Sequence, residues 1–247
     1  MAVTTREDTR VHLRESHEES PKPLKIVGIS VPFPGAKRPF NLRQEQIILG
    51  TILGDGYLHK PTDRETNSRL VTSCCEKDED YIFWKYQELS SSYLFPYPPK
   101  LSSTYLDGKE FKRWMIRSKN NIVFTEYRDL FYPQGRKIVP SKALEYLNDL
   151  GLAVWYMDDG SLSKKRYLNG DLANLKICTQ CFTWEEDILI RDWFKERYKI
   201  SPFRIQERGD NRYILRLSHG NSIKRFLSIV SPYVEEVKCM KRKIRKK

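Results

Sequence analysis

The sequence lacks any uninterrupted apolar stretch of the roughly 18 residues that a membrane-spanning helix needs. Cysteine is scarce, with five residues in a chain of 247. Their spacing is irregular: two adjacent residues, one isolated CxxC pair and one lone residue, at Cys74, Cys75, Cys178, Cys181 and Cys239. This pattern excludes a disulfide framework. It also makes zinc binding a weak hypothesis, because the CxxC pair has no second pair or histidines beside it.

The N-terminus has no apolar segment of the kind that a signal peptide needs, and its early residues include several acids: Glu7, Asp8, Glu15, Glu18 and Glu19. Acids at these positions argue against a transit peptide. We therefore expect a protein that is not secreted and that acts where it is made, either in an organelle (mitochondrion or chloroplast) that encodes it or in a bacterial cytoplasm.

Positive charge is what the chain has in excess, with 44 Lys and Arg against 32 Asp and Glu and a net charge of +12. Such a surface repels itself unless it meets a polyanion, so nucleic acid is the leading partner. An anionic membrane surface is the second candidate, but no long basic amphipathic helix supports it. We expect no membrane partner.

Residues 1–40 are charged at first and then rich in proline, which predicts a flexible arm followed by an extended segment. Asn41 is a good helix N-cap, and Gln44 stands where the second residue of a capping box belongs. The helix that starts here should run through Leu53 and end at Gly54-Asp55-Gly56, because glycine permits a left-handed turn.

An internal repeat organises the rest of the chain. Residues 48–56 and 152–160 are both apolar helical segments that end in Asp-Gly, and the same order of elements follows each of them. We expect strands or strand-like runs at 57–60, 70–75, 100–106, 111–118, 161–164, 176–181, 202–208 and 212–218, and helices at 78–89, 121–131, 184–198 and 221–230. The predicted fold class is α+β, with two αββαββα repeats at 41–140 and 141–247 that pack together.

Alternation along the second strand pair of each repeat separates an apolar face from a basic one. The basic face carries Arg113 and Arg117 in the first repeat, and Arg204, Gln206, Arg208, Arg212 and Arg216 in the second. One such hairpin could be an ordinary solvated surface. Two of them on a strongly basic chain favour a groove for DNA or RNA, since Arg and Gln are the side chains that recognise guanine and adenine edges.

Asp55 and Asp159 end the two equivalent helices, where the helix dipole already disfavours a carboxylate. A single Asp-Gly would be a simple turn. If the repeat packs these helices in parallel, however, the two carboxylates meet at one end and raise each other's pKa. A divalent cation such as Mg²⁺ between them would relieve this repulsion and would leave coordination sites for phosphate oxygens. Gly50 and Gly54 leave space for close helix approach.

These residues resemble the two-motif, single-chain LAGLIDADG homing endonucleases encoded in introns. The stretches 49–57 and 152–160 are similar to the two signature helices of that family, and 180–186 is similar to a segment that follows the second signature. The resemblance covers about residues 41–247. Val154 departs from the family pattern, because a small residue usually stands there, and it predicts a less tight helix crossing.

The resemblance implies a site-specific DNA endonuclease that acts as a monomer on a target of about 20 base pairs. Its saddle-shaped sheets would lie in the major groove. It would cut both strands across the minor groove and leave short 3′ overhangs. Asp55 and Asp159 would ligate about two or three Mg²⁺ ions, with Mn²⁺ or Ca²⁺ as substitutes for binding. The main-chain carbonyls of Gly54 and Asp158 would be further ligands.

The family also uses basic residues near the scissile phosphates. Lys137 matches this position in the first half. In the second half we choose Lys241, with Lys238 as the alternative. Gln180 would position solvent in one half only, because its partner in the repeat is Cys74, so the two active sites should be unequal. Further DNA contacts are expected at the basic C-terminal residues 238–247 and at His59, Lys60 and Lys164.

Two binding functions remain as alternatives to cleavage. Some members of the family are RNA maturases that help their host intron to fold, and the basic sheets would serve such a protein, with intron RNA as a partner. A more remote alternative is a regulator that binds DNA without cutting it. Both aspartates are intact here, which favours the endonuclease.

Overall fold

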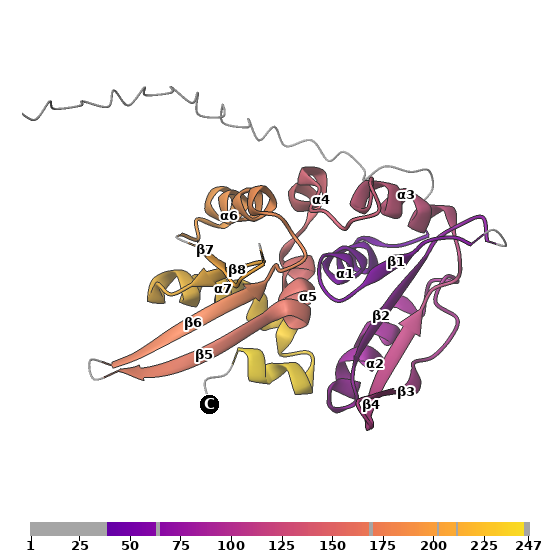
Figure 1. Ribbon diagram of the computed structural model, residues 1–247, viewed down its shortest axis with the longest axis horizontal. Coiled ribbons are helices and arrows are strands. Elements are labelled where there is room, and N and C mark those ends of the chain that lie inside the picture. The colour runs from indigo at the N-terminus through magenta and orange to yellow at the C-terminus, as the bar shows by residue number, and fades with distance from the viewer. Residues whose placement is uncertain (1–38, 63–64, 168–169, 202, 211, 245–247) are drawn as a thin grey trace, which may run out of the picture. The chain divides into compact units, whose positions relative to one another are not determined.

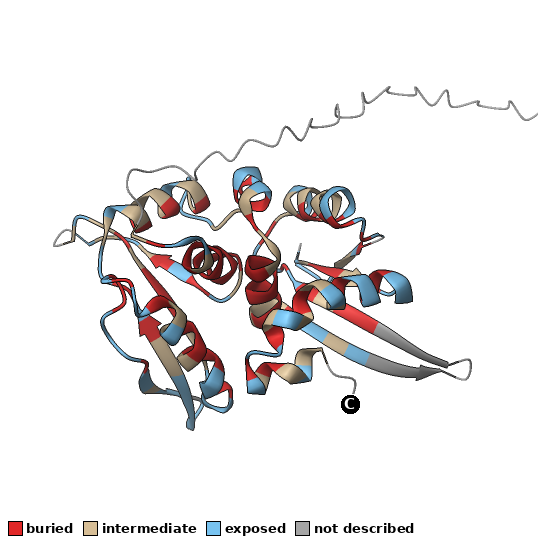
Figure 2. Cartoon of the chain, turned by 180° about the vertical axis from the view of Figure 1, so that it is seen from behind, coloured by how far each residue is buried: buried red, intermediate tan, exposed pale blue. Residues whose placement is uncertain are grey.

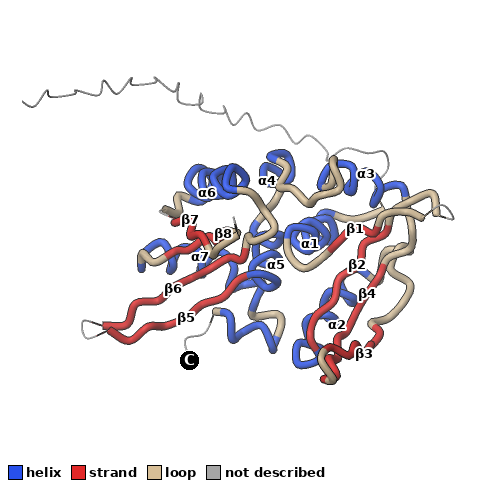
Figure 3. The backbone as a smooth tube through the Cα atoms, in the orientation of Figure 1, coloured by secondary structure: helices blue, strands red, loops and turns tan. Residues whose placement is uncertain are grey.

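The computed structural model describes residues 39–62, 65–167, 170–201, 203–210 and 212–244, without the side chains of 106, 164–167 and 170–173. These residues fall within one compact unit. The predicted arm at 1–40 lies almost entirely outside them. Helices and strands alternate along the chain in the mixed α+β arrangement that the repeat predicts (Figure 3). No helix in the described part of the chain has the length and apolarity needed to cross a membrane.

The first half follows the predicted order of elements (Figure 1). It contains α1 (Leu42–Leu53), β1 (Tyr57–His59), β2 (Arg69–Cys75), the short 3₁₀ helix η1 (Glu76–Asp78), α2 (Glu79–Leu89), β3 (Lys100–Leu106), β4 (Lys109–Arg117) and α3 (Ile122–Phe131). Each of the predicted helices and strands is present, with ends within about three residues of the expected ones.

The second half repeats this order after a short helix, α4 (Ser141–Tyr146), that the sequence pattern did not predict. It contains α5 (Asp149–Asp159), β5 (Gly160–Tyr167), β6 (Gly170–Cys178), α6 (Trp184–Tyr198), β7 (Phe203–Glu207), β8 (Tyr213–Leu217), α7 (Gly220–Val234) and the 3₁₀ helix η2 (Lys238–Lys243). The β5–β6 hairpin is longer than expected, and α7 continues through Pro232. The predicted division of the chain at residue 140 falls just before α4 and stays a prediction.

Each half forms a four-stranded antiparallel sheet with the same strand order, β1-β2-β4-β3 and β5-β6-β8-β7. Tyr57 and Ser161, each two residues after the aspartate of its half, pair with Val71 and Lys176. This register makes Val71 and Lys176 equivalent. Counting along β2 and β6 from there, the partner of Gln180 is Cys75 and not Cys74 as expected from the sequence. A single-residue shift of this kind is what pattern matching alone leaves open.

Helix caps define where the two central helices begin. The Asn41 side chain accepts from the Gln44 amide and the Gln44 side chain accepts from the Asn41 amide, which confirms the predicted capping box of α1. The Asn148 side chain accepts from the amides of Leu150 and Gly151 and caps α5. These caps satisfy amides that would otherwise be unpaired in the interior of the protein.

Helices α1 and α5 lie side by side at the centre of the core, and Figure 2 shows both as almost continuously buried. A Cβ added at Gly50 would lie 2.8 Å from the Val154 Cβ and would collide with the Gly151 carbonyl. The prediction that Gly50 and Gly54 permit close approach is therefore confirmed. The prediction that Val154 loosens the crossing is wrong, because Gly50 opposite leaves the volume that the valine fills.

We predict that Gly50→Ala destabilises the protein by at least about 2 kcal/mol, although alanine favours helices by about 1 kcal/mol over glycine. The new methyl group would force the backbones of α1 and α5 apart. Gly220→Ala is the matched control, because a Cβ there meets nothing within 4 Å. Urea denaturation measures both variants. Equal stability of the two would show that the helix contact is not as close as described.

Candidate active site at the ends of the paired helices

Asp55 and Asp159 lie where each central helix passes into the first strand of its sheet. Asp55 follows the end of α1 and precedes β1, while Asp159 is the last residue of α5 and precedes β5. Burial raises the pKa of Asp159 to about 7, and the charges of Asp158 and Asp55 add to this rise. Burial and the charge of Asp158 also raise the pKa of Asp55. The packing thus brings the two predicted acids into one electrostatic site.

The side chain of Asp158 is a third acid at this site, and it is fully paired. Its carboxylate accepts hydrogen bonds from Lys85 Nζ at 2.9 and 3.1 Å and from the Tyr81 hydroxyl at 2.8 Å. It also accepts from the main-chain amide of Asp55 at 3.2 Å. From the sequence we expected only the main-chain carbonyl of Asp158 to take part, as a metal ligand. The sequence held no signal for this ion pair, because Lys85 comes from α2, some seventy positions away.

Lys137 reaches the first helix end from the segment between α3 and α4. Its Nζ donates to the Gly54 carbonyl at 2.7 Å and to the Gly56 carbonyl at 3.4 Å. Burial lowers the pKa of Lys137, and the nearby acids Asp159, Asp158 and Asp55 oppose that effect. The predicted lysine therefore stands beside the predicted acid.

In the second half, Lys243 takes the corresponding place. Its Nζ donates to the Asp158 carbonyl at 3.0 Å and also to the Met157 carbonyl. The Tyr156 hydroxyl donates to the Lys243 carbonyl at 2.7 Å and holds this part of η2 against α5. Lys243 thus stands at the position where we expected Lys241, with Lys238 as the alternative, and which lysine acts on the phosphate stays a prediction. The 3₁₀ geometry of η2 decides which lysine faces the helix end, and the sequence did not predict this short helix.

A short repeated tripeptide could have identified Lys243 from the sequence. Arg-Lys-Ile occurs at 136–138 and again at 242–244. Each arginine forms an ion pair with the start of a helix in the other half: Arg136 with Glu186 at 2.9 Å, and Arg242 with Asp78 at 2.8 Å. The two lysines are therefore equivalent by sequence, by position and by contact.

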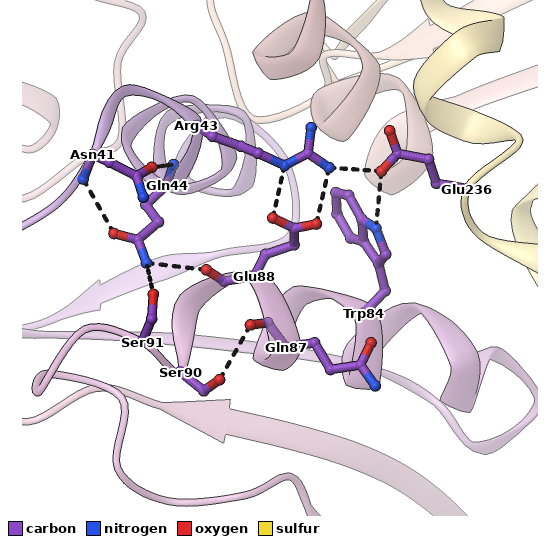
Figure 4. A network of polar contacts seen from close by, with 9 residues as sticks. All are labelled: Asn41, Arg43, Gln44, Trp84, Gln87, Glu88, Ser90, Ser91 and Glu236. Carbon is purple, nitrogen blue, oxygen red and sulfur yellow. Dashed lines mark hydrogen bonds and ion pairs between the residues drawn. The ribbon is translucent and has the colours of Figure 1, made fainter.

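A polar network ties the chain just before η2 to the first half of the molecule (Figure 4). Arg43 on α1 contacts both oxygens of Glu88 on α2, at 2.7 and 2.9 Å, and its Nη2 also donates to Glu236 at 2.7 Å. The indole of Trp84 donates to the same Glu236 oxygen at 3.2 Å. Since Glu236 lies two residues before η2, this network helps to place Lys243 at the acids.

Gln180 lies in the turn after β6 and is exposed. Its Oε1 is 3.5 Å from the Cys178 thiol, which donates to it. Among the described residues Gln180 makes no hydrogen bond to the acids, so its role toward solvent stays a prediction.

The basic face predicted for the second sheet is built across three strands. Arg204, Arg216 and Lys176 stand in one row of paired residues on β7, β8 and β6. Arg216 donates to Asn174 at 2.9 Å and to Gln206 at 3.2 Å, so its guanidinium is held in place. Arg208 and Arg212 are exposed beyond the strand ends. Lys164 lies on β5, but its side chain is outside the described part.

The first sheet carries a sparser basic face. Arg113 and Arg117 are exposed on β4, and Arg117 lies over the Tyr97 ring at 5.8 Å. His59 is partly exposed, with its Nδ1 3.7 Å from Glu65, and Lys60 is exposed just after β1. Both sheets thus present cations, and the first strand of each sheet follows directly from an acid-bearing helix end. This is a suitable arrangement for a phosphodiester backbone.

Two pseudo-symmetric αββαββα halves, joined through buried helices that end in acids and bearing basic sheets, define a class of single-chain proteins built to act on nucleic acid. The family is shown by comparison with known proteins. The chain belongs to the LAGLIDADG DNA endonuclease family, whose model matches residues 45–226. The resemblance noted in the sequence is thereby confirmed.

Individual relatives agree with this assignment. The chain is 28% identical to the DNA endonuclease I-ChuI of Chlamydomonas applanata over 213 residues, covering 82% of this chain and 94% of that one. It is 26% identical to the cytochrome b mRNA maturase bI2 of Saccharomyces cerevisiae, covering 79% of this chain and 46% of the relative. The fold is similar to that of the homing endonuclease I-WcaI bound to its DNA recognition sequence, with a TM-score of 0.72, 24% identity, and 84% and 88% of the two chains covered.

Proposed function

We propose that the protein is a monomeric, Mg²⁺-dependent homing endonuclease that hydrolyses both strands of a long, asymmetric DNA target. One observation carries the proposal: two acids from equivalent helix ends, a partly buried Asp159 and an exposed Asp55, share one electrostatic site next to the basic sheets. Membership of the family and the similarity to I-ChuI support DNA as the substrate. Cleavage across the minor groove with short 3′ overhangs is part of this proposal.

The sheets would bind the target through their basic faces in the major groove, over about 20 base pairs. Arg216 is the best-positioned reader of base edges, because Asn174 and Gln206 hold its guanidinium. Exposed cations would mainly bind phosphates and make affinity depend on salt. The proposed contact set is His59, Lys60, Arg113, Arg117, Lys164, Arg204, Gln206, Arg208, Arg212 and Arg216.

The acids and their neighbours fit a hard divalent cation. The available metal ligands are oxygen atoms, from the carboxylates of Asp55 and Asp159 and the carbonyls of Gly54 and Asp158. Burial and the charge of Asp158 raise the pKa of both carboxyls, the charge of Asp55 adds to the rise at Asp159, and a bound cation would relieve that cost. No three His, Cys, Asp or Glu side chains within the described ranges lie together as a metal cluster. When bound, Mg²⁺ supplies a more acidic water and neutralises charge on the phosphate.

Lys137 and Lys243 would act on the phosphate itself. Their ammonium groups lie at the two equivalent carbonyls, at 2.7 Å from Gly54 and 3.0 Å from Asp158. An ammonium in each half would stabilise the extra negative charge of the pentavalent phosphorus during in-line attack. Gln180 would orient solvent in the second half only, since Cys75 stands in its place in the first.

A role as an intron RNA maturase is the second candidate, and the relative bI2 is the observation that favours it. The basic sheets would then bind folded RNA rather than the DNA major groove. A splicing assay of the host intron with and without the protein distinguishes the two functions, and a positive result in both assays would show that one chain performs both.

We predict that Asp55→Asn and Asp159→Asn each reduce double-strand cleavage at least about 100-fold while leaving DNA affinity within about threefold. Each change removes a charge that the cation needs, but neither alters the sheets. The substrate is the joined sequence that flanks the intron carrying the gene. Asp192→Asn, on the exposed side of α6, is the control. Undiminished cutting by both active-site variants would overturn the acid assignment.

Divalent-ion binding should weaken in acid. Because the pKa of Asp159 is about 7, the carboxylate is mostly charged at pH 8 and mostly protonated at pH 6, and metal competes with that proton. Mn²⁺ affinity measured by calorimetry should therefore fall about tenfold between pH 8 and pH 6. Asp159→Asn should bind weakly at both values. Equal affinity of the wild-type protein at both would contradict the assignment.

The structure distinguishes the two candidate lysines of the second half. Lys243→Met should reduce cleavage about 10- to 100-fold, because it removes the cation beside the Asp158 carbonyl. Lys241→Met should stay within about threefold of wild type and serves as the matched control, since it removes the same charge from η2. Strand-cleavage rates at saturating enzyme measure both. A larger loss for Lys241→Met would restore the choice made from the family resemblance.

A further inference from the structure

The two acids of the site are held in place by different means. Asp159 is still part of α5, so its backbone belongs to the helix. Asp55 lies past the end of α1, where the amides of Gly54 and Gly56 return to helix carbonyls at 3.0 and 2.7 Å. The amide of Asp55 donates instead to the Asp158 carboxylate of the other half, at 3.2 Å.

That carboxylate is itself fixed by two residues of α2. Lys85 Nζ and the Tyr81 hydroxyl both donate to it, and the side chains of Lys85 and Asp158 are each only 1% exposed. The Tyr81 hydroxyl also lies 3.2 Å from the Val154 carbonyl of α5. With three donors around it and almost no water, the carboxylate has little freedom to move.

Among the described residues, the end of α1 has no equivalent of the Lys85–Asp158 pair that stands at the end of α5. Gly54 stands where the second half has Asp158, and it has no side chain to offer. Counted from the helix starts at Glu79 and Trp184, Lys85 corresponds to Ile190 on α6, which is an apolar core residue. A buried charged pair is costly unless it is well satisfied, so its presence on one side only calls for a functional reason.

We propose that Lys85 and Tyr81 are positioning residues that hold the Asp158 carboxylate, and that this carboxylate places Asp55 for cleavage of one DNA strand. The Asp159 site is placed by its own helix and does not need them. The inference rests on the proposed endonuclease function and deepens it. The two strands of the target are therefore cut by sites of unequal construction, and only one of them depends on α2.

Strand-resolved cleavage tests the proposal. Each strand of the target carries its own fluorescent label, and Asp55→Asn identifies the strand that depends on Asp55. Tyr81→Phe, which removes one hydroxyl, should slow that strand at least about tenfold and the other less than about threefold. Lys85→Met should show the same bias more strongly. Equal slowing of both strands, or no effect of either variant, would overturn it.

Tyr198→Phe is the matched control. Its hydroxyl donates to Asp149 at 2.9 Å, at the opposite end of α5, so the variant removes an equivalent buried hydrogen bond far from the acids. It should leave the ratio of the two strand rates unchanged. A change of that ratio equal to the one in Tyr81→Phe would show a general packing effect and would reject the positioning role.

A second measurement separates this inference from the proposed function. Hydrogen exchange should show faster exchange of the Asp55 amide in Tyr81→Phe and Lys85→Met than in wild type, with the Asp159 amide unchanged. If the wild-type protein cuts no DNA, the proposed function fails, while this exchange pattern still reports whether Asp55 is held across the interface. Unchanged exchange of Asp55 would reject the positioning role by itself.

Discussion

The close packing of α1 against α5 is the constraint on which the site depends. Gly50 lets the helices approach until the Val154 side chain and the Gly151 backbone fill the space beside it. Because both helices run to the same end, this one contact decides how near their terminal acids come to each other. A wider crossing would separate Asp55 from Asp159 and leave two isolated carboxylates at ordinary helix ends.

Placing several charges in a low-dielectric interior is costly, and the protein meets that cost with cations from distant parts of the chain. Lys85 neutralises Asp158 on one side, while Lys137 and Lys243 lie at the two helix-end carbonyls. Within the described residues, the two acids proposed to bind metal have no ion pair of this closeness, and burial together with the charge of Asp158 raises the pKa of each. A site of this kind is prepared for a mobile cation and a phosphate.

The two halves are also linked crosswise at the segments that carry the site lysines. Arg136 in the first half contacts Glu186 in the second, and Arg242 in the second contacts Asp78 in the first. Each lysine is thereby placed by an ion pair with the opposite half. Such links make the site a property of the whole molecule, so that neither repeat holds a complete set of contacts by itself.

The repeat and the polar alternation in the sequence were sufficient to predict the α+β class, the order of elements and the position of the two acids at equivalent helix ends. These features depend on local periodicity and on residue types at helix ends. Tertiary structure alone decided three features: the position of Lys243 at the end of α5, the Lys85–Asp158 pair, and the register that makes Gln180 equivalent to Cys75. Each depends on contacts between segments far apart in the chain, and a buried lysine on α2 looks in sequence like any solvated one. Local patterns therefore determine what the elements are, whereas packing between the halves determines which charges meet.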